Sequence, residues 1–245
     1  MLSYIDSTYL KTSEQANISE SENKEAVKSF IREAIHYKFK LIMIRSNYIS
    51  LARKLINNCE SSLLVGTVID FPSGNSSTKS KLFEIQNAIN LEADDIDVVI
   101  NYRQFKKEQL NYISNEVKYC TDICLKHNKT IKWIIESAAL SNKEIISICQ
   151  LIRDLTLNQF GKEAAHKVFI KSSTGFFISN NKKSSGATIE HIKLMVEHSF
   201  PLPVKASGGI RNLKDFNTMI ELGVKRIGTS SALSIVQGKT STSIY

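Results

Sequence analysis

The sequence contains few of the residues that mark membrane, metal or disulfide-stabilised proteins. None of its apolar runs approaches the roughly 18 residues that a spanning helix needs, which excludes a membrane-spanning helix. It has only four cysteines, without the C-x-x-C spacing typical of zinc sites or redox pairs. We expect them to be reduced thiols within helical segments, at Cys59, Cys120, Cys124 and Cys149.

The N-terminus and the charge distribution exclude further classes. Residues 1–11 have neither a basic region nor a continuous apolar stretch, so no secretory signal is expected and a cytoplasmic location is predicted. The 32 basic and 24 acidic residues give a net charge of +8, which suits an anionic ligand. Because no block of five or six like charges occurs, we expect no nucleic-acid partner, and a small phosphorylated substrate is favoured.

The chain also lacks a Gly/Ser-rich linker and has only three prolines, which favours one domain over residues 1–245 with a flexible tail from about residue 238. Short apolar runs recur instead, separated by amphipathic helical periodicities such as 83–89 and 213–222. Eight runs are predicted to be strands: 3–6, 41–45, 63–69, 96–100, 131–136, 168–172, 203–206 and 225–228.

These repeats predict an α/β fold of one particular kind. Eight strand–helix units in 245 residues match the (β/α)8 TIM barrel, whose usual length is about 250 residues. A doubly wound sheet would alternate strands and helices too, but its dinucleotide-binding form needs a G-x-G-x-x-G motif that this chain lacks.

Four charged residues interrupt or end the predicted strands: Asp97, Glu136, Lys171 and Lys205. An ion-pair network, for instance Lys171 with Asp97 or Glu136, would explain each of them singly. Taken together they indicate chemistry, because barrel active sites lie at the carboxyl ends of the strands. Two lysines on neighbouring strands lower the pKa of one of them, and a neutral lysine can form an imine with a carbonyl. Asp97 would then transfer protons through water.

Two glycine-containing loops follow the last two predicted strands, at Ser207-Gly208-Gly209 and at Gly228-Thr229-Ser230-Ser231. Glycine lets backbone N–H groups approach an anion closely, and these are the positions of phosphate sites in barrels. Tight loops alone would also explain the glycines. Thr174-Gly175, after the sixth strand, is a third candidate edge of the site.

Metal chemistry is not favoured by the sequence. The five histidines fall in predicted helices or loops away from the strand ends, without an accompanying carboxylate cluster. Cys120 and Cys124 share a helix face, a spacing more typical of packing.

Several segments together resemble the signatures of the deoxyribose-phosphate aldolase family, whose members are class I, Schiff-base aldolases. They are Phe169-Ile170-Lys171-Ser172-Ser173-Thr174-Gly175-Phe176, Val204-Lys205-Ala206-Ser207-Gly208-Gly209-Ile210-Arg211 and Ile96-Asp97-Val98-Val99-Ile100-Asn101, with weaker similarity at 4–10, 68–74, 186–188 and 226–231.

The resemblance implies roles for particular residues. Lys171 would form the Schiff base, Lys205 would lower its pKa and Asp97 would relay protons. The substrate and phosphate would be bound by Asp6, Thr8, Phe71, Thr174, Gly175, Ser207, Gly208, Gly209, Gly228, Ser230 and Ser231. The family reversibly cleaves 2-deoxyribose 5-phosphate to acetaldehyde and glyceraldehyde 3-phosphate, with no metal or organic cofactor.

The sequence departs from this resemblance at the pocket mouth and in one insertion. Ser7 replaces a histidine, Arg45-Ser46 replace Asn-Pro, Asp70 replaces a glycine and Ser172 replaces a threonine, while residues 177–185 form a longer insertion. None of these changes removes a proposed catalytic group, but they are expected to alter turnover and substrate range.

The final residue, Tyr245, ends a polar tail that could reach back to the catalytic face. Some members of the family end in a tyrosine that helps to remove a proton from C2 of the imine, and the resemblance implies this role for Tyr245. The alternative hypothesis is that the protein is a catalytically weak relative that binds phosphosugars or regulates a partner. A third hypothesis is a transaldolase-like enzyme. A homodimer is also possible.

Overall fold

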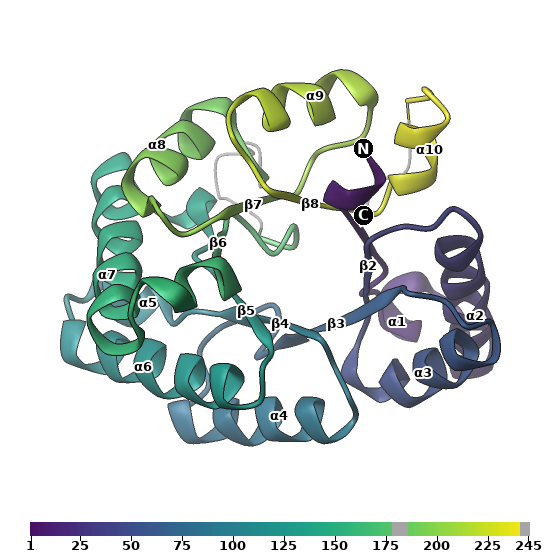
Figure 1. The fold of residues 1–245 in the computed structure, drawn as a ribbon, viewed down its shortest axis with the longest axis horizontal. Helices are drawn as coiled ribbons and strands as arrows, with labels where there is room; N and C mark the ends of the chain where they lie inside the picture. Colours follow the sequence, from purple (N-terminus) through teal and green to yellow (C-terminus); the bar gives the residue numbers. More distant parts are fainter. Residues whose placement is uncertain (178–185, 241–245) are drawn as a thin grey trace.

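Eight parallel strands close into one barrel, in which each strand pairs with the next along the chain and β8 pairs with β1 (Figure 1). The structure is a computed structural model that describes residues 1–177 and 186–240. The predicted TIM barrel is therefore confirmed, with strands β1 Ile5–Thr8, β2 Leu41–Met43, β3 Leu64–Ile69, β4 Asp95–Val99, β5 Thr130–Ile134, β6 Val168–Lys171, β7 Val204–Ser207 and β8 Arg226–Thr229.

The α-helices surround the ring of strands (Figure 1). They are α1 Ser13–Ala16, α2 Glu20–His36, α3 Ile49–Asn58, α4 Thr78–Asn90, α5 Tyr102–Lys106, α6 Leu110–Lys126, α7 Asn142–Phe160, α8 Ile189–Ser199, α9 Leu213–Glu221 and α10 Ala232–Val236. Short 3-10 helices lie at η1 Leu2–Tyr4, η2 Ser46–Tyr48, η3 Ser137–Ala139 and η4 Lys162–Lys167. Among the described residues, no helix is long and apolar enough to cross a membrane.

Local sequence signals set the ends of these helices. Asn212 caps α9 by accepting a hydrogen bond from the backbone N–H of Asp215, as the sequence predicts. Gly223, just beyond this helix, has a φ of +96°, a left-handed conformation that favours glycine. α2 and α7 begin with capping boxes, in which Ser19 pairs with Glu22 and Ser141 with Glu144.

Some sequence predictions were wrong in detail, and the second and fifth strands end at Met43 and Ile134, two residues earlier than predicted. The first strand begins at Ile5 instead of residue 3, because residues 2–4 form a 3-10 turn before it. Phe83 begins the predicted amphipathic stretch 83–89, but it is 69% exposed, and the buried residues of α4 are Lys81, Ile85 and Ala88. Lys81 Nζ donates to the carbonyl of Val99 at 2.6 Å and forms an ion pair with the buried Glu116 of α6. This ion pair anchors α4 to α6.

Alternation along the strands separates an apolar shell from a charged interior. In β5, Trp133 faces outward, where its indole N–H donates to Thr121 of α6 at 3.2 Å. Its neighbour Lys132 points the other way and is fully buried among carboxylates. The barrel therefore packs its helices through apolar residues and keeps its charged groups inside.

Candidate active site

Asp97 brings the two predicted lysines together. Lys171, at the end of β6, donates to Asp97 Oδ2 at 2.9 Å, and Lys205 of β7 donates to the same oxygen at 2.8 Å. Asp97 and Lys205 are fully buried, and Lys171 is 4% exposed. One carboxylate oxygen of β4 thus bridges two amines on adjacent strands, as the sequence predicts.

These three residues belong to a larger set of seven buried charged side chains, here called the barrel charge cluster. Lys132 donates to Asp97 Oδ1 at 3.0 Å and to Asp95 Oδ2 at 2.6 Å. Lys205 lies 2.6 Å from Asp6 Oδ2, whose other oxygen pairs with Arg226. The members are Asp6, Asp95, Asp97, Lys132, Lys171, Lys205 and Arg226.

The pKa of Lys171 is lowered to about 8. Burial is the largest cause, the positive charge of Lys205 adds to it, and Asp97 opposes it. The prediction from the sequence, that the neighbouring Lys205 alone lowers this pKa, is therefore corrected: burial is the larger cause. With a pKa near 8, about a tenth of Lys171 is neutral at pH 7.

The charge balance of the cluster explains why a proton is lost here. Four cations and three carboxylates give the fully ionised cluster a net charge of +1. Neutral Lys171 makes the cluster neutral, which is favourable in a buried environment. The pKa of Asp97 stays well below its usual value, because Lys132, Lys171 and Lys205 together outweigh the effect of burial. Asp97 therefore remains an ionised carboxylate.

A narrow pocket opens beside Lys171 and contains several of the predicted binding residues. Gly208, after β7, has a φ of +88°, and a Cβ there would lie 2.8 Å from the Cα of Gly186, so the two loops can approach this closely only with glycine. The pocket is lined by Thr8, Leu10, Lys171, Thr174, Gly175, Ser207, Gly208, Gly228 and Thr229.

The residues expected after β8 divide into two groups. Gly228, predicted to belong to the loop, lies inside β8, which ends one residue later at Thr229. A Cβ at Gly228 would lie 3.0 Å from Cε of Lys205. Its missing side chain leaves room for that lysine. Ser230 and Ser231 do form the turn into α10. Ser231 Oγ is buried and makes no hydrogen bond within the described part of the chain.

Other predicted binding residues lie apart from this pocket lining. Asp6 is fully buried in the barrel charge cluster, so the structure places it as a partner of Lys205 and Arg226 rather than as a wall of the pocket. Phe71 follows β3 and packs edge-on against Phe176. Gly209 follows Gly208 with a φ of +80°. Tyr245 lies outside the described residues, and its role in proton transfer stays a prediction.

Two of the departures from the family pattern, Asp70 and Arg45, have physical explanations in the structure. Asp70 has a φ of +49°, the left-handed conformation that suits the glycine expected there. Its carboxylate accepts from the N–H and Oγ of Ser76 at 2.8 and 2.9 Å, which holds the loop after β3. Arg45 donates to the carbonyls of Leu10 and Phe71 and stacks on the Phe71 ring. Residues 178–185 of the insertion lie outside the described residues.

Sequence reasoning missed three members of the cluster: Asp95, Lys132 and Arg226. The signal was present, because each is a charged residue in a predicted strand or at its edge, as Asp97 is. Lys132 occurs within Ile131-Lys132-Trp133, where alternation places it opposite the outward-facing tryptophan. Applying the same rule to every strand would have identified it.

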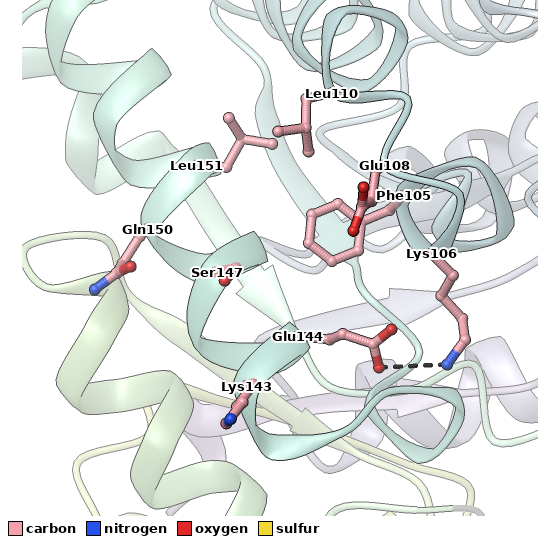
Figure 2. A pocket seen from close by; sticks show the side chains of 9 residues that line it. All are labelled: Phe105, Lys106, Glu108, Leu110, Lys143, Glu144, Ser147, Gln150 and Leu151. Atoms are coloured by element: carbon pink, nitrogen blue, oxygen red, sulfur yellow. Dashed lines mark hydrogen bonds and ion pairs between the residues drawn. The ribbon is translucent and has the colours of Figure 1, made fainter.

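A second hollow, of about 640 Å³, lies on the outer surface between α5, the start of α6 and α7 (Figure 2). Its walls include Phe105, Leu110 and Leu151, and Lys106 pairs with Glu144 at 3.3 Å on one side. It holds none of the barrel charge cluster. Among residues 1–177 and 186–240, no group of three or more histidine, cysteine or acidic side chains could hold a metal ion.

A (β/α)8 barrel that holds a buried lysine of lowered pKa against a carboxylate and a second lysine defines a class I, lysine-dependent aldolase. Comparison with known proteins agrees. The chain belongs to the DeoC/LacD family of aldolases, whose family model matches residues 2–238.

Individual relatives cover nearly the whole chain. It is 38% identical to a deoxyribose-phosphate aldolase of Staphylococcus epidermidis over 242 residues, covering 98% of this chain and 97% of the relative. It is 35% identical to deoxyribose-phosphate aldolase 1 of Staphylococcus aureus, and the match covers 99% of this chain and 98% of the relative. A solved structure of the tetrameric deoxyribose-phosphate aldolase of Aeropyrum pernix matches with a TM-score of 0.76 and 25% identity. The match covers 96% of this chain and 89% of that structure's chain.

Proposed function

We propose that this aldolase reversibly cleaves 2-deoxy-D-ribose 5-phosphate to D-glyceraldehyde 3-phosphate and acetaldehyde, through an imine on Lys171. The observation that carries the proposal is the contact of Lys171 and Lys205 through one oxygen of Asp97, beside a pocket walled by glycine loops. The names of the relatives at 35–38% identity support this substrate.

The proposed reaction begins with neutral Lys171, whose amine adds to the C1 aldehyde and loses water to form the imine. The C3 hydroxyl then gives up its proton, and the electrons of the C2–C3 bond move into the protonated imine, which becomes a neutral enamine. Glyceraldehyde 3-phosphate leaves, and an enamine remains on the lysine. Protonation at C2 and hydrolysis release acetaldehyde. Asp97, ionised before the reaction, accepts the C3 hydroxyl proton through a water molecule and returns a proton to C2 of the enamine by the same route, with Lys205 beside it.

Phosphate binding is assigned to the loops after β7 and β8. The backbone of Gly208 and Gly209 has no side chain that would keep an anion away, and the buried Ser231 Oγ has a proton to donate. Thr174 and Gly175 supply another edge of the same pocket. We propose that these groups bind the 5-phosphate, while the part of the pocket next to the Lys171 amine holds C1.

Borohydride trapping tests the proposal. Incubation with 2-deoxyribose 5-phosphate and borohydride should add a stable mass to Lys171, located by peptide mapping, and acetaldehyde should appear in a coupled assay. An adduct on Lys205 would reverse the assigned roles. Absence of any adduct would favour the catalytically weak relative, although all three catalytic groups are present and in contact.

Assembly and location complete the proposal. We propose a homodimer acting in the cytoplasm; the relative from Aeropyrum pernix is described as a tetramer. Light scattering of the purified chain measures the subunit number directly.

A further inference from the structure

Glu136 is a buried charged residue that the proposed reaction does not use. It lies two residues beyond the end of β5 and is 1% exposed. Its backbone has a φ of +52° and a ψ of +62°, a left-handed conformation that is uncommon for a residue with a side chain. Such a conformation persists where the surroundings determine it strongly, often next to a functional site.

The carboxylate of Glu136 binds the loop that follows the imine-forming lysine. Oε1 accepts from Ser173 Oγ at 2.7 Å, and Oε2 accepts from Thr174 Oγ1 at 2.5 Å. The backbone N–H of Thr174 also donates to Oε2, at 3.2 Å. One carboxylate therefore binds both hydroxyls of a two-residue segment.

Each hydroxyl also accepts a hydrogen bond from the backbone N–H two residues further along the chain. Ser173 Oγ accepts from the N–H of Gly175 at 2.9 Å, and Thr174 Oγ1 accepts from the N–H of Phe176 at 3.1 Å. Two parallel hydrogen-bond chains thus run from the loop backbone through a hydroxyl to one oxygen each of Glu136. Because both hydroxyl protons point to the carboxylate, the hydroxyl lone pairs are available to fix the turn.

The strand ends are joined in the same place. The N–H of Ile135 donates to the carbonyl of Lys171 at 3.0 Å, and that of Ser137 donates to the carbonyl of Ser172 at 2.8 Å. Glu136 is therefore held between two backbone bonds, and its carboxylate reaches the neighbouring loop. Thr174 and Gly175 of that loop wall the pocket that contains Lys171, whereas Glu136 is outside its lining.

We propose that Glu136 is a positioning residue, which fixes the Thr174–Gly175 wall for binding of the phosphorylated end of the substrate. This inference rests on the proposed function, because it assigns substrate binding to that wall. Glu136 acts on the substrate only through the two hydroxyls. Lys171 itself hydrogen-bonds to Asp97, so imine formation does not require Glu136.

Glu136→Gln tests the proposal, because an amide cannot accept both hydroxyl protons with both of its ends. Losing one charged hydrogen bond should raise KM for 2-deoxyribose 5-phosphate about tenfold, with a smaller change in kcat. KM for unphosphorylated deoxyribose should change little. Borohydride trapping of acetaldehyde should still occur on Lys171, at a pH midpoint no higher than in the parent, because the negative charge that is lost favours protonated Lys171. Glu163→Gln, on the exposed surface, is the control with the same change of charge.

Ser173→Ala is a milder variant that removes one of the two hydrogen-bond chains, and it keeps the test decisive if Glu136→Gln fails to fold. It should raise the same KM, and the effects of the two substitutions should not add when combined. Unchanged KM values, or equal losses with both sugars, would overturn the positioning role. A parent protein that traps no aldehyde would instead refute the proposed function itself.

Discussion

Replacing Lys205 by leucine should shift imine formation to higher pH. The amines of Lys171 and Lys205 bind one oxygen of Asp97 at 2.9 and 2.8 Å, which places them on the order of 5 Å apart. At an effective dielectric constant of about 20, two charges at that separation repel by about 3 kcal/mol. Removing one therefore stabilises the protonated form of the other and moves the midpoint upward by about two pH units.

The direction follows from the lowered pKa of Lys171. In the proposed reaction the neutral form reacts, so the rate of trapping should rise with pH through about 8 in the parent protein. In Lys205→Leu the same rise should occur at higher pH, and the neutral fraction at pH 7 should fall about a hundredfold.

The assay is the initial rate of borohydride trapping with acetaldehyde, measured by mass spectrometry between pH 6 and 11. Lys225→Leu removes an exposed lysine next to β8 and should leave the midpoint unchanged. Thermal melting shows that each variant is folded. An unchanged midpoint in folded Lys205→Leu would refute the reasoning, and burial alone would then account for the reactive lysine.

Three further predictions concern the pocket and the shell of helices. Ser230→Asp places a negative charge at the proposed phosphate site, so KM for 2-deoxyribose 5-phosphate should rise at least about tenfold in steady-state assays, with little effect on deoxyribose; equal losses would contradict phosphate binding there. Gly228→Ala brings a methyl group to 3.0 Å from Lys205 Cε, and turnover in steady-state assays should fall about tenfold; unchanged turnover would show that the position of Lys205 does not depend on this glycine. Glu116→Gln leaves the buried ammonium of Lys81 with only its longer ion pair, to Asp70 at 3.5 Å, and urea unfolding should show a loss of roughly 3 kcal/mol; a loss below about 0.5 kcal/mol would show that the Lys81–Glu116 ion pair adds little.

The barrel was predictable because its signals are local. Apolar runs, helix caps such as Asn212 and the count of eight repeats do not depend on distant contacts. Asp97, Lys171 and Lys205 could be found because charged residues are rare in buried strands. The start of the first strand could not be predicted, because the 3-10 turn at residues 2–4 has no side-chain cap that marks it in the sequence.

The contacts within the site were less predictable. The sequence left open whether Lys171 pairs with Asp97 or with Glu136. The structure decides for Asp97, because Glu136 turns away through its left-handed backbone toward two hydroxyls. That conformation is not encoded by a glycine or asparagine. Similarly, nothing in the local pattern of α4 predicts that Lys81 faces inward and Phe83 faces solvent, since the partner Glu116 is 35 residues away.

The barrel charge cluster divides unevenly along the chain. Its three carboxylates all come from β1 and β4, and its four cations all come from β5 to β8. Each half of the barrel taken alone would gather charges of one sign at its exposed inner edge and repel itself. The two halves are therefore electrostatic complements, and barrel closure neutralises both at once. A chain cut between α6 and β5 should reassemble from its two fragments, and high salt should slow that association.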